Sequence, residues 1–198
     1  MDKETKDKKK SLVLWFNEIT IEDTPLVGGK NSSLGEMYRE LTRKGVNVPN
    51  GFAITAAAYK LFVKEAGIEK DVKRILTGLN IKDVEKVAEA GYMVRELIKK
   101  AEFPQQLKKE ILEAYAKMCK EYRTHVDVAV RSSATLEDLE GASFAGQQES
   151  YLNIRGESSL LEACKKCFAS LFTNRAIVYR HEKGFDHFKV ALSIGVQK

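Results

Sequence analysis

The sequence contains little proline and little cysteine, and it has no long apolar segment. Among 198 residues there are three of each of these two residue types. An odd and low number of cysteines argues against a disulfide-built secreted domain and fits a reducing cytoplasm. No apolar run approaches the roughly 20 residues that cross a bilayer, and the charged stretch Met1–Lys10 lacks the apolar core of a secretory signal. We therefore predict a cytoplasmic protein with no membrane partner.

Charge of one sign does not dominate the chain either. There are 33 basic and 28 acidic residues, which gives a formal net charge of +5. A basic surface can attract nucleic acid or the phosphates of a nucleotide. A nucleic-acid-binding module would interleave aromatic residues with Lys and Arg on one sheet face, whereas the aromatic residues here recur mostly at core spacings. We predict a solvated Lys/Glu surface and no nucleic-acid partner.

The first part of the chain predicts a tail, two strands and two helices. Residues 1–11 are polar and predict a disordered tail. Gly45 is expected to stop the first helix, and Thr55 can cap the second, with Gly67 just after its end. The strands are predicted at 12–16 and 52–54, and the helices at 33–44 and 56–66.

Residues 69–121 predict a helical insert. Asp83 can cap one helix of the insert, and Pro104 fits the first turn of the next. In both helices the apolar residues repeat at helical spacing, so each helix should have one inward face. The inward residues are predicted to be Val84, Val87, Ala88, Gly91, Val94 and Ile98, followed by Leu107, Ile111, Tyr115, Met118 and Tyr122.

The remainder of the chain predicts three strands and two further helices. Ser159 to Glu162 is a capping-box pattern that opens one helix, and Asn174 can cap another that runs to about Lys183. Because strands and helices mix without strict alternation, we predict an α+β fold. The last strand reaches almost to the final residue, which suggests a shortened piece of a longer protein. The strands are predicted at 127–131, 149–154 and 189–196.

The segment Val27–Met37, VGGKNSSLGEM, places two glycines and a lysine directly before a predicted helix. Glycine lets backbone amides approach an anion closely, and Lys30 adds a mobile positive charge. The segment is not a Walker A loop, because Asn31 follows Lys30 and Thr24 stands where that loop requires glycine. Taken alone, a Gly-Gly turn before a helix is more often structural than functional.

A second polar motif follows the apolar residues 128–130. Arg131 emerges at the end of this predicted strand beside Ser132 and Ser133, and its guanidinium suits bidentate contact with a phosphate. The alternative is a strand-end arginine in a surface ion pair. The small, amide-rich segment 143–148 suits a lid over phosphates, although an isolated loop of this kind indicates little.

In order and spacing, these motifs together resemble the N-terminal domain of the pyruvate/phosphoenolpyruvate dikinase family, a variant of the ATP-grasp fold. The resemblance covers about residues 12–198. Within the family, the opening Val13–Phe16, the RSSAT segment and the SFAGQQ loop are most similar to the phosphoenolpyruvate synthase (pyruvate, water dikinase) branch. The motifs are GGKNSSLGEM at 28–37, VPNGFAIT at 48–55, VRSSATLED at 130–138, ASFAGQQE at 142–149, FASLF at 168–172 and NRAIVYR at 174–180.

The resemblance implies a fold and a set of nucleotide contacts. Residues 12–198 would form the first subdomain of an ATP-grasp-like domain, with a mixed sheet and the helical insert. Lys30 and Arg131 match the family's phosphate-binding lysine and arginine, and Arg131 also has the catalytic role. Arg175 matches a further basic residue that faces the nucleotide, and 141–148 matches a mobile phosphate lid. The residues implied to bind ATP are Gly28, Gly29, Lys30, Arg131, Ser143, Gly146, Gln147 and Arg175.

The resemblance also implies the chemistry of a longer parent enzyme. In the family, ATP with Mg²⁺ passes a pyrophosphoryl group to a histidine on a separate domain. Phosphate is then released to water, and the remaining phosphoryl group converts pyruvate to phosphoenolpyruvate. The fragment alone would be inactive, with its Mg²⁺ ligands outside it, and the parent's oligomeric state is left open, a homo-oligomer included. The alternatives are part of a related dikinase or antibiotic phosphotransferase, or a stand-alone half-domain without catalysis.

Three other sets of residues contain types that can form catalytic or metal sites. Cys164 and Cys167 have the spacing of half a zinc site, but no second pair exists, and both fall on an apolar helical stripe, which predicts core cysteines. The three histidines lack the surroundings of the family's phosphorylated histidine and are expected at helix ends or in loops. The acidic residues are expected to be loop charges, because the family's Mg²⁺ carboxylates lie elsewhere. The histidines are His125, His181 and His187, and the acidic residues are Glu137, Asp138 and Glu140.

Overall fold

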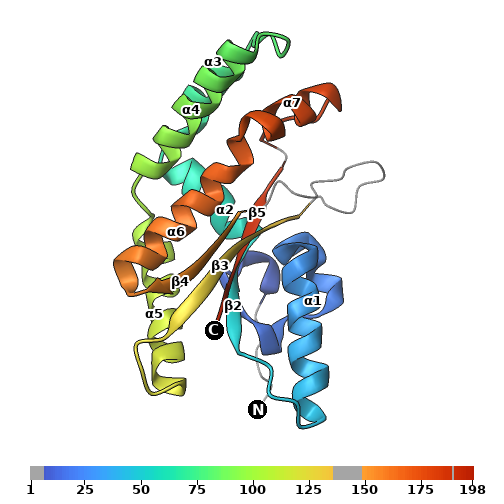
Figure 1. Cartoon of the computed structure of the whole chain (residues 1–198), viewed down its shortest axis with the longest axis vertical. Coiled ribbons are helices and arrows are strands. Elements are labelled where there is room, and N and C mark those ends of the chain that lie inside the picture. The colour runs from blue at the N-terminus through green and yellow to red at the C-terminus, as the bar shows by residue number, and fades with distance from the viewer. Residues whose placement is uncertain (1–6, 136–148, 189) are drawn as a thin grey trace.

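The computed structural model describes residues 7–135, 149–188 and 190–198, which form a five-stranded sheet with helices on both faces (Figure 1). The strand order is β1-β2-β5-β3-β4, and every pairing between these strands is antiparallel. The α+β class is confirmed, but the sheet is antiparallel where a mixed one was predicted, because β5 lies between β2 and β3 and runs opposite to both. The strands are β1 (Val13–Trp15), β2 (Gly51–Ile54), β3 (Asp127–Ala134), β4 (Ser150–Arg155) and β5 (Leu192–Gln197).

Seven α-helices are present in the described ranges, and they divide between the two faces of the sheet. Helix α1 packs against β3 and β5 on one face, while α2, α5 and α6 lie on the other, as Figure 1 shows. Helices α3 and α4 fill the predicted insert with α5, and α4 packs on α6 and α7. The helices are α1 (Thr24–Arg43), α2 (Ala56–Glu65), α3 (Glu69–Leu76), α4 (Val84–Lys100), α5 (Gln105–Glu121), α6 (Glu157–Ala169) and α7 (Asn174–Glu182).

Hydroxyl and carboxylate caps begin several of these helices. Thr55 accepts a hydrogen bond from the Ala58 amide, and Asp83 accepts one from the Lys86 amide, as predicted. Helix α6 starts earlier than the capping-box pattern predicts, because Gly156, with φ of 85°, turns the chain from β4 directly into the helix. Thr173, rather than Asn174, caps α7, since its hydroxyl accepts from the Ala176 amide.

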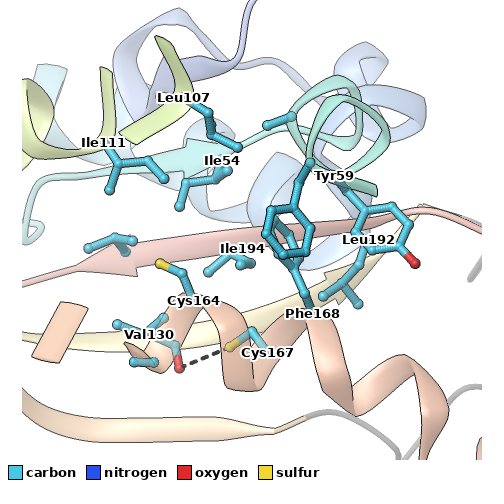
Figure 2. Packing of buried hydrophobic residues seen from close by; sticks show 14 of the residues in the cluster. Ile54, Tyr59, Leu107, Ile111, Val130, Cys164, Cys167, Phe168, Leu192 and Ile194 are labelled. Atoms are coloured by element: carbon cyan, nitrogen blue, oxygen red, sulfur yellow. Dashed lines mark hydrogen bonds between the residues drawn. The ribbon is translucent and has the colours of Figure 1, made fainter. Parts of the chain in front are cut away.

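The main core lies on the face of the sheet that α2, α5 and α6 cover (Figure 2). Cys164 and Cys167 are fully buried there, which confirms the prediction of core cysteines, and burial raises the pKa of both thiols. The prediction for Val84 was wrong: its side chain is 76% exposed at the first residue of α4, and Ala90 is buried instead.

Part of the predicted tail is held against the domain. Residues 8–10 form a 3-10 turn, and the Lys8 ammonium lies 2.7 Å from the Asp23 carboxylate. Ser11 is buried and its carbonyl accepts a hydrogen bond from the Thr55 hydroxyl. Residues 7–11 are therefore ordered by contacts that no local pattern reveals, and residues 1–6 lie outside the described range.

Candidate functional site

Helix α1 is interrupted at Gly28, and a new helical segment starts at Gly29. Gly28 has φ of 74° and ψ of 161°, a backbone conformation that is essentially restricted to glycine. The sequence predicts a helix only from residue 33, but the structure has helical residues on both sides of this break, from Thr24 onward. A Cβ atom on Gly28 would lie 2.7 Å from the Ala134 carbonyl oxygen and would collide with the Ser133 hydroxyl. Glycine therefore allows α1 to touch the end of β3.

Asn31 holds the beginning of this second segment to β5. Its side chain is 1% exposed, and Nδ2 donates a hydrogen bond of 3.0 Å to the Ser193 hydroxyl. Ser193 in turn donates to the Ile54 carbonyl at 2.7 Å. Gly195, on the same face of β5, leaves space for the Asn31 amide, because a Cβ atom at 195 would collide with it.

A hollow of about 430 Å³ lies between the first turns of this segment and the sheet. Lys30 reaches it from α1, and Arg131 reaches it from β3, where it pairs with Gly195 of β5. Both cations are exposed, and none of the described lining residues is Asp or Glu. The hollow is therefore positively charged and suited to an anion. Its described lining is Gly29, Lys30, Asn31, Ser33, Leu34, Met37, Arg131, Gly195 and Gln197.

The predicted nucleotide contacts divide into three groups. Gly29, Lys30 and Arg131 line the hollow, and Gly28 is buried at the break just before them. Arg175 is exposed in the first turn of α7, which packs against α4 and the 3-10 turn Ser170–Phe172, and it is not among the described lining residues. The remaining predicted contacts, Ser143, Gly146 and Gln147, lie outside the described ranges. So do the rest of the predicted lid and the acidic residues Glu137, Asp138 and Glu140.

Six lining residues were not predicted from the sequence. Ser33, Leu34 and Met37 follow Lys30 at helical spacing and so share its side of α1, a signal that the sequence did contain. Asn31 directly follows Lys30. Gly195 and Gln197 come from β5, at the other end of the chain, and no local pattern connects them to Lys30.

The three histidines lie at helix ends or in loops, as predicted, and one of them contacts a buried arginine. Arg180 is fully buried, and its Nε donates a 2.9 Å hydrogen bond to His187 Nδ1. Another nitrogen of Arg180 donates to the Leu171 carbonyl. Burial, followed by the nearby Arg180 charge, lowers the pKa of His187 from 6.5 to about 4. His187 is therefore neutral near pH 7 and serves as a hydrogen-bond acceptor.

The described residues do not fit a metal site. None of them forms a group of three or more His, Cys, Asp or Glu side chains that could hold an ion. The part of the chain that the structure describes also has no helix long and apolar enough to span a bilayer. The side-chain cations and the start of a helix suit the hollow to an anion.

Residues 24–198 match the family described as pyruvate phosphate dikinase, AMP/ATP-binding domain. The chain belongs to this family. The match starts at the first residue of α1 and includes every described residue that lines the hollow. Dikinase family membership thus rests on nearly the whole chain rather than on a single motif.

The chain is also similar to curated proteins named phosphoenolpyruvate synthase. It is 59% identical to that of Synechocystis sp., with 96% of this chain and 24% of the relative covered. It is 55% identical to that of Aquifex aeolicus, with 97% and 22% covered. It is 48% identical to that of Escherichia coli, with 94% and 24% covered. The chain therefore spans about a quarter of the length of these relatives.

Proposed function

We propose that this chain binds the phosphates of ATP in the hollow between α1 and the sheet, as the AMP/ATP-binding part of a phosphoenolpyruvate synthase. The observation that carries the proposal is the convergence of Lys30 and Arg131. They are far apart in the sequence, yet they line one hollow whose described lining has no acidic side chain. Membership of an AMP/ATP-binding family supplies the class of anion.

The two cations have complementary roles toward a phosphate chain. Lys30 supplies a compact charge on a flexible stem, while the guanidinium of Arg131 can bind two phosphate oxygens at once. The start of the helical segment at Gly29 adds partial positive charge from the helix dipole. Such groups stabilise the charge that spreads over phosphate oxygens during transfer. We include Arg175 and the segment of Ser143, Gly146 and Gln147 in the proposed site as contacts made when the nucleotide is bound.

The parent protein would convert ATP, pyruvate and water to AMP, phosphoenolpyruvate and phosphate in the cytoplasm. A pyrophosphoryl group would leave ATP for a histidine on another domain, which leaves AMP behind. Mg²⁺ supplies charge neutralisation on the phosphates when it is bound. We assign its protein ligands to other parts of the parent, as the family resemblance implies.

The binding proposal is tested by titrating the 198-residue chain with pyrophosphate and with ATP, followed by amide chemical shifts. We expect weak, saturable binding that shifts Gly29 and Lys30. Replacing Lys30→Gln or Arg131→Gln should weaken it at least about tenfold, because each removes a charged hydrogen bond. Lys82→Gln, an exposed lysine in the loop before α4, is the control. Unchanged affinity in both site variants would refute the assignment.

The reaction proposal is tested on the longer parent protein. Incubated with ATP, Mg²⁺ and pyruvate, it should form AMP and phosphoenolpyruvate in equal amounts. ADP as the sole nucleotide product would exclude a dikinase reaction. Binding by the 198-residue chain would be unaffected by that outcome, so the two parts of the proposal can fail separately.

A further inference from the structure

We infer that Asn31 is a positioning residue: it fixes the start of the helical segment Gly29–Arg43 on β5, so that Lys30 and Arg131 face the same anion. The inference rests on the proposed function of the hollow. Asn31 borders the hollow, but its amide nitrogen is directed to the sheet. Its action on a phosphate would therefore be exerted through Lys30, its neighbour in the chain.

The contact between Asn31 and β5 is chemically specific. Ser193 is fully buried and uses its only proton in the hydrogen bond to the Ile54 carbonyl. Its oxygen can then only accept, and the Asn31 amide nitrogen supplies the donor at 3.0 Å. An aspartate at 31 has no such proton when ionised, and an apolar residue would leave the hydroxyl oxygen without a donor. The two hydrogen bonds from Asn31 to Ser193 and from Ser193 to Ile54 thus fix the position of α1 relative to β5 and β2.

The sheet beneath Asn31 pairs the relevant residues of β3 and β5. Arg131 is opposite Gly195, and Ser133 is opposite Ser193. Asn31 packs against Gly195 and donates a hydrogen bond to Ser193, while Gly28, three residues earlier, packs closely against Ser133. The start of the segment is thus held at two points, one on each strand. Lys30 lies between them along the chain, which sets its position relative to Arg131.

Two substitutions remove the proposed link from opposite sides. Asn31→Ala deletes the donor, and Ser193→Ala deletes the acceptor while leaving Asn31 in place; the second is the milder change. The matched control is Tyr115→Phe on α5. Its buried hydroxyl donates to the Val126 carbonyl at 2.7 Å and accepts from the Gly156 amide at 2.9 Å, away from the hollow.

The first measurement needs no ligand. The amides of residues 34–37 bond the carbonyls of residues 30–33 in the first turn of the segment, so their hydrogen exchange reports how firmly that turn is held. We expect about tenfold faster exchange in Asn31→Ala and Ser193→Ala, relative to residues 39–42 in the same helix. Tyr115→Phe should not change this ratio. Unchanged exchange at 34–37 in both variants overturns the inference.

The second measurement is the affinity for pyrophosphate. We expect about tenfold weaker binding in each variant, and no further loss in the double variant, because both delete the same link. If the wild-type chain binds pyrophosphate and Asn31→Ala binds it equally well, the inference is overturned. If the wild-type chain does not bind it, the proposed phosphate site fails, and the exchange result alone decides whether Asn31 positions the segment.

Discussion

The two faces of the sheet are packed in different ways. On the face covered by α2, α5 and α6, large side chains interlock. The centroid of the Phe168 ring lies 5.2 Å from that of Tyr59 and 5.3 Å from that of Phe62. On the α1 face, close contacts at the start of the helical segment involve Gly28, Asn31 and Gly195. A smaller apolar cluster supports the rest of that face, formed by Leu14, Phe16, Ile19, Val27 and Ala53.

This difference in packing suggests that one face mainly stabilises the fold, while the other mainly fixes the positions of side chains. Burial of apolar side chains is favourable in proportion to area and tolerates some rearrangement. Close glycine contacts and a buried amide hydrogen bond bury less apolar area, but they restrict the distance and the orientation between the two segments that they join. The face with the hollow is the one where the proposed phosphate site needs Lys30 and Arg131 held relative to each other. We therefore expect substitutions on the two faces to have separable effects on unfolding and on anion binding.

The largest effect is expected from Phe168→Ala on the interlocked face. Phe168 is fully buried and contacts three aromatic rings. Its truncation should lower the free energy of unfolding by about 3 to 5 kcal/mol, measured by denaturant unfolding. Leu152→Ala, on the exposed strand β4, is the control and should change it by less than about 0.5 kcal/mol. Similar losses in the two variants would contradict the proposed contrast.

A smaller loss is expected from Gly28→Ala on the α1 face. The substitution forces an unfavourable backbone conformation and a collision with Ser133, so we expect a loss of about 2 to 3 kcal/mol. Gly67→Ala is a matched control, because φ there is 68° and the space around a Cβ is open. Gly67→Ala should lower the free energy of unfolding by only about 1 kcal/mol, from backbone strain alone. Equal losses in thermal unfolding would show that the contact with β3 is unimportant.

A loss of folding stability at acid pH is expected from the Arg180–His187 hydrogen bond, which joins α7 to the segment before β5. The pKa of His187 is lowered from 6.5 to about 4 in the folded protein, so between these values the unfolded chain binds the extra proton. The contribution of neutral His187 to the free energy of unfolding is therefore fully present above pH 6.5 and is lost as the pH falls through about 4. His187→Gln retains an acceptor for Arg180 without titrating. Its stability should depend less on pH over this range, and an unchanged pH profile would contradict the role of His187.

The smallest effect on stability is expected at the hollow itself. Arg131 is exposed on β3, so Arg131→Gln should change the free energy of unfolding by less than about 0.5 kcal/mol. The same variant should lose pyrophosphate affinity, as described above. A large loss of stability would make Arg131 a structural residue and would remove the contrast between the two faces.

Local chemistry made much of the fold predictable. The caps at Thr55 and Asp83, the glycine after α2 and the inward stripes of α4 and α5 are properties of short segments, and most of them appear as expected. The exceptions depend on neighbours. Val84 continues the apolar stripe of α4, but it is left exposed at the beginning of the helix. The helical residues before Gly28 are not predicted by the local pattern, because a helix restarts after this glycine only where β3 packs against it.

The sequence by itself determined the family, most of the strands and helices, and the two cations of the candidate site. These follow from residue types and short spacings, which a linear chain displays directly. Only the tertiary structure decided that the sheet is antiparallel, that Gly195 and Gln197 border the same hollow as Lys30, and that Asn31 is bonded to Ser193. Each of these depends on β5 taking its place between β2 and β3. A contact between the two ends of a chain is set by the packing of the whole sheet, and no local pattern encodes it.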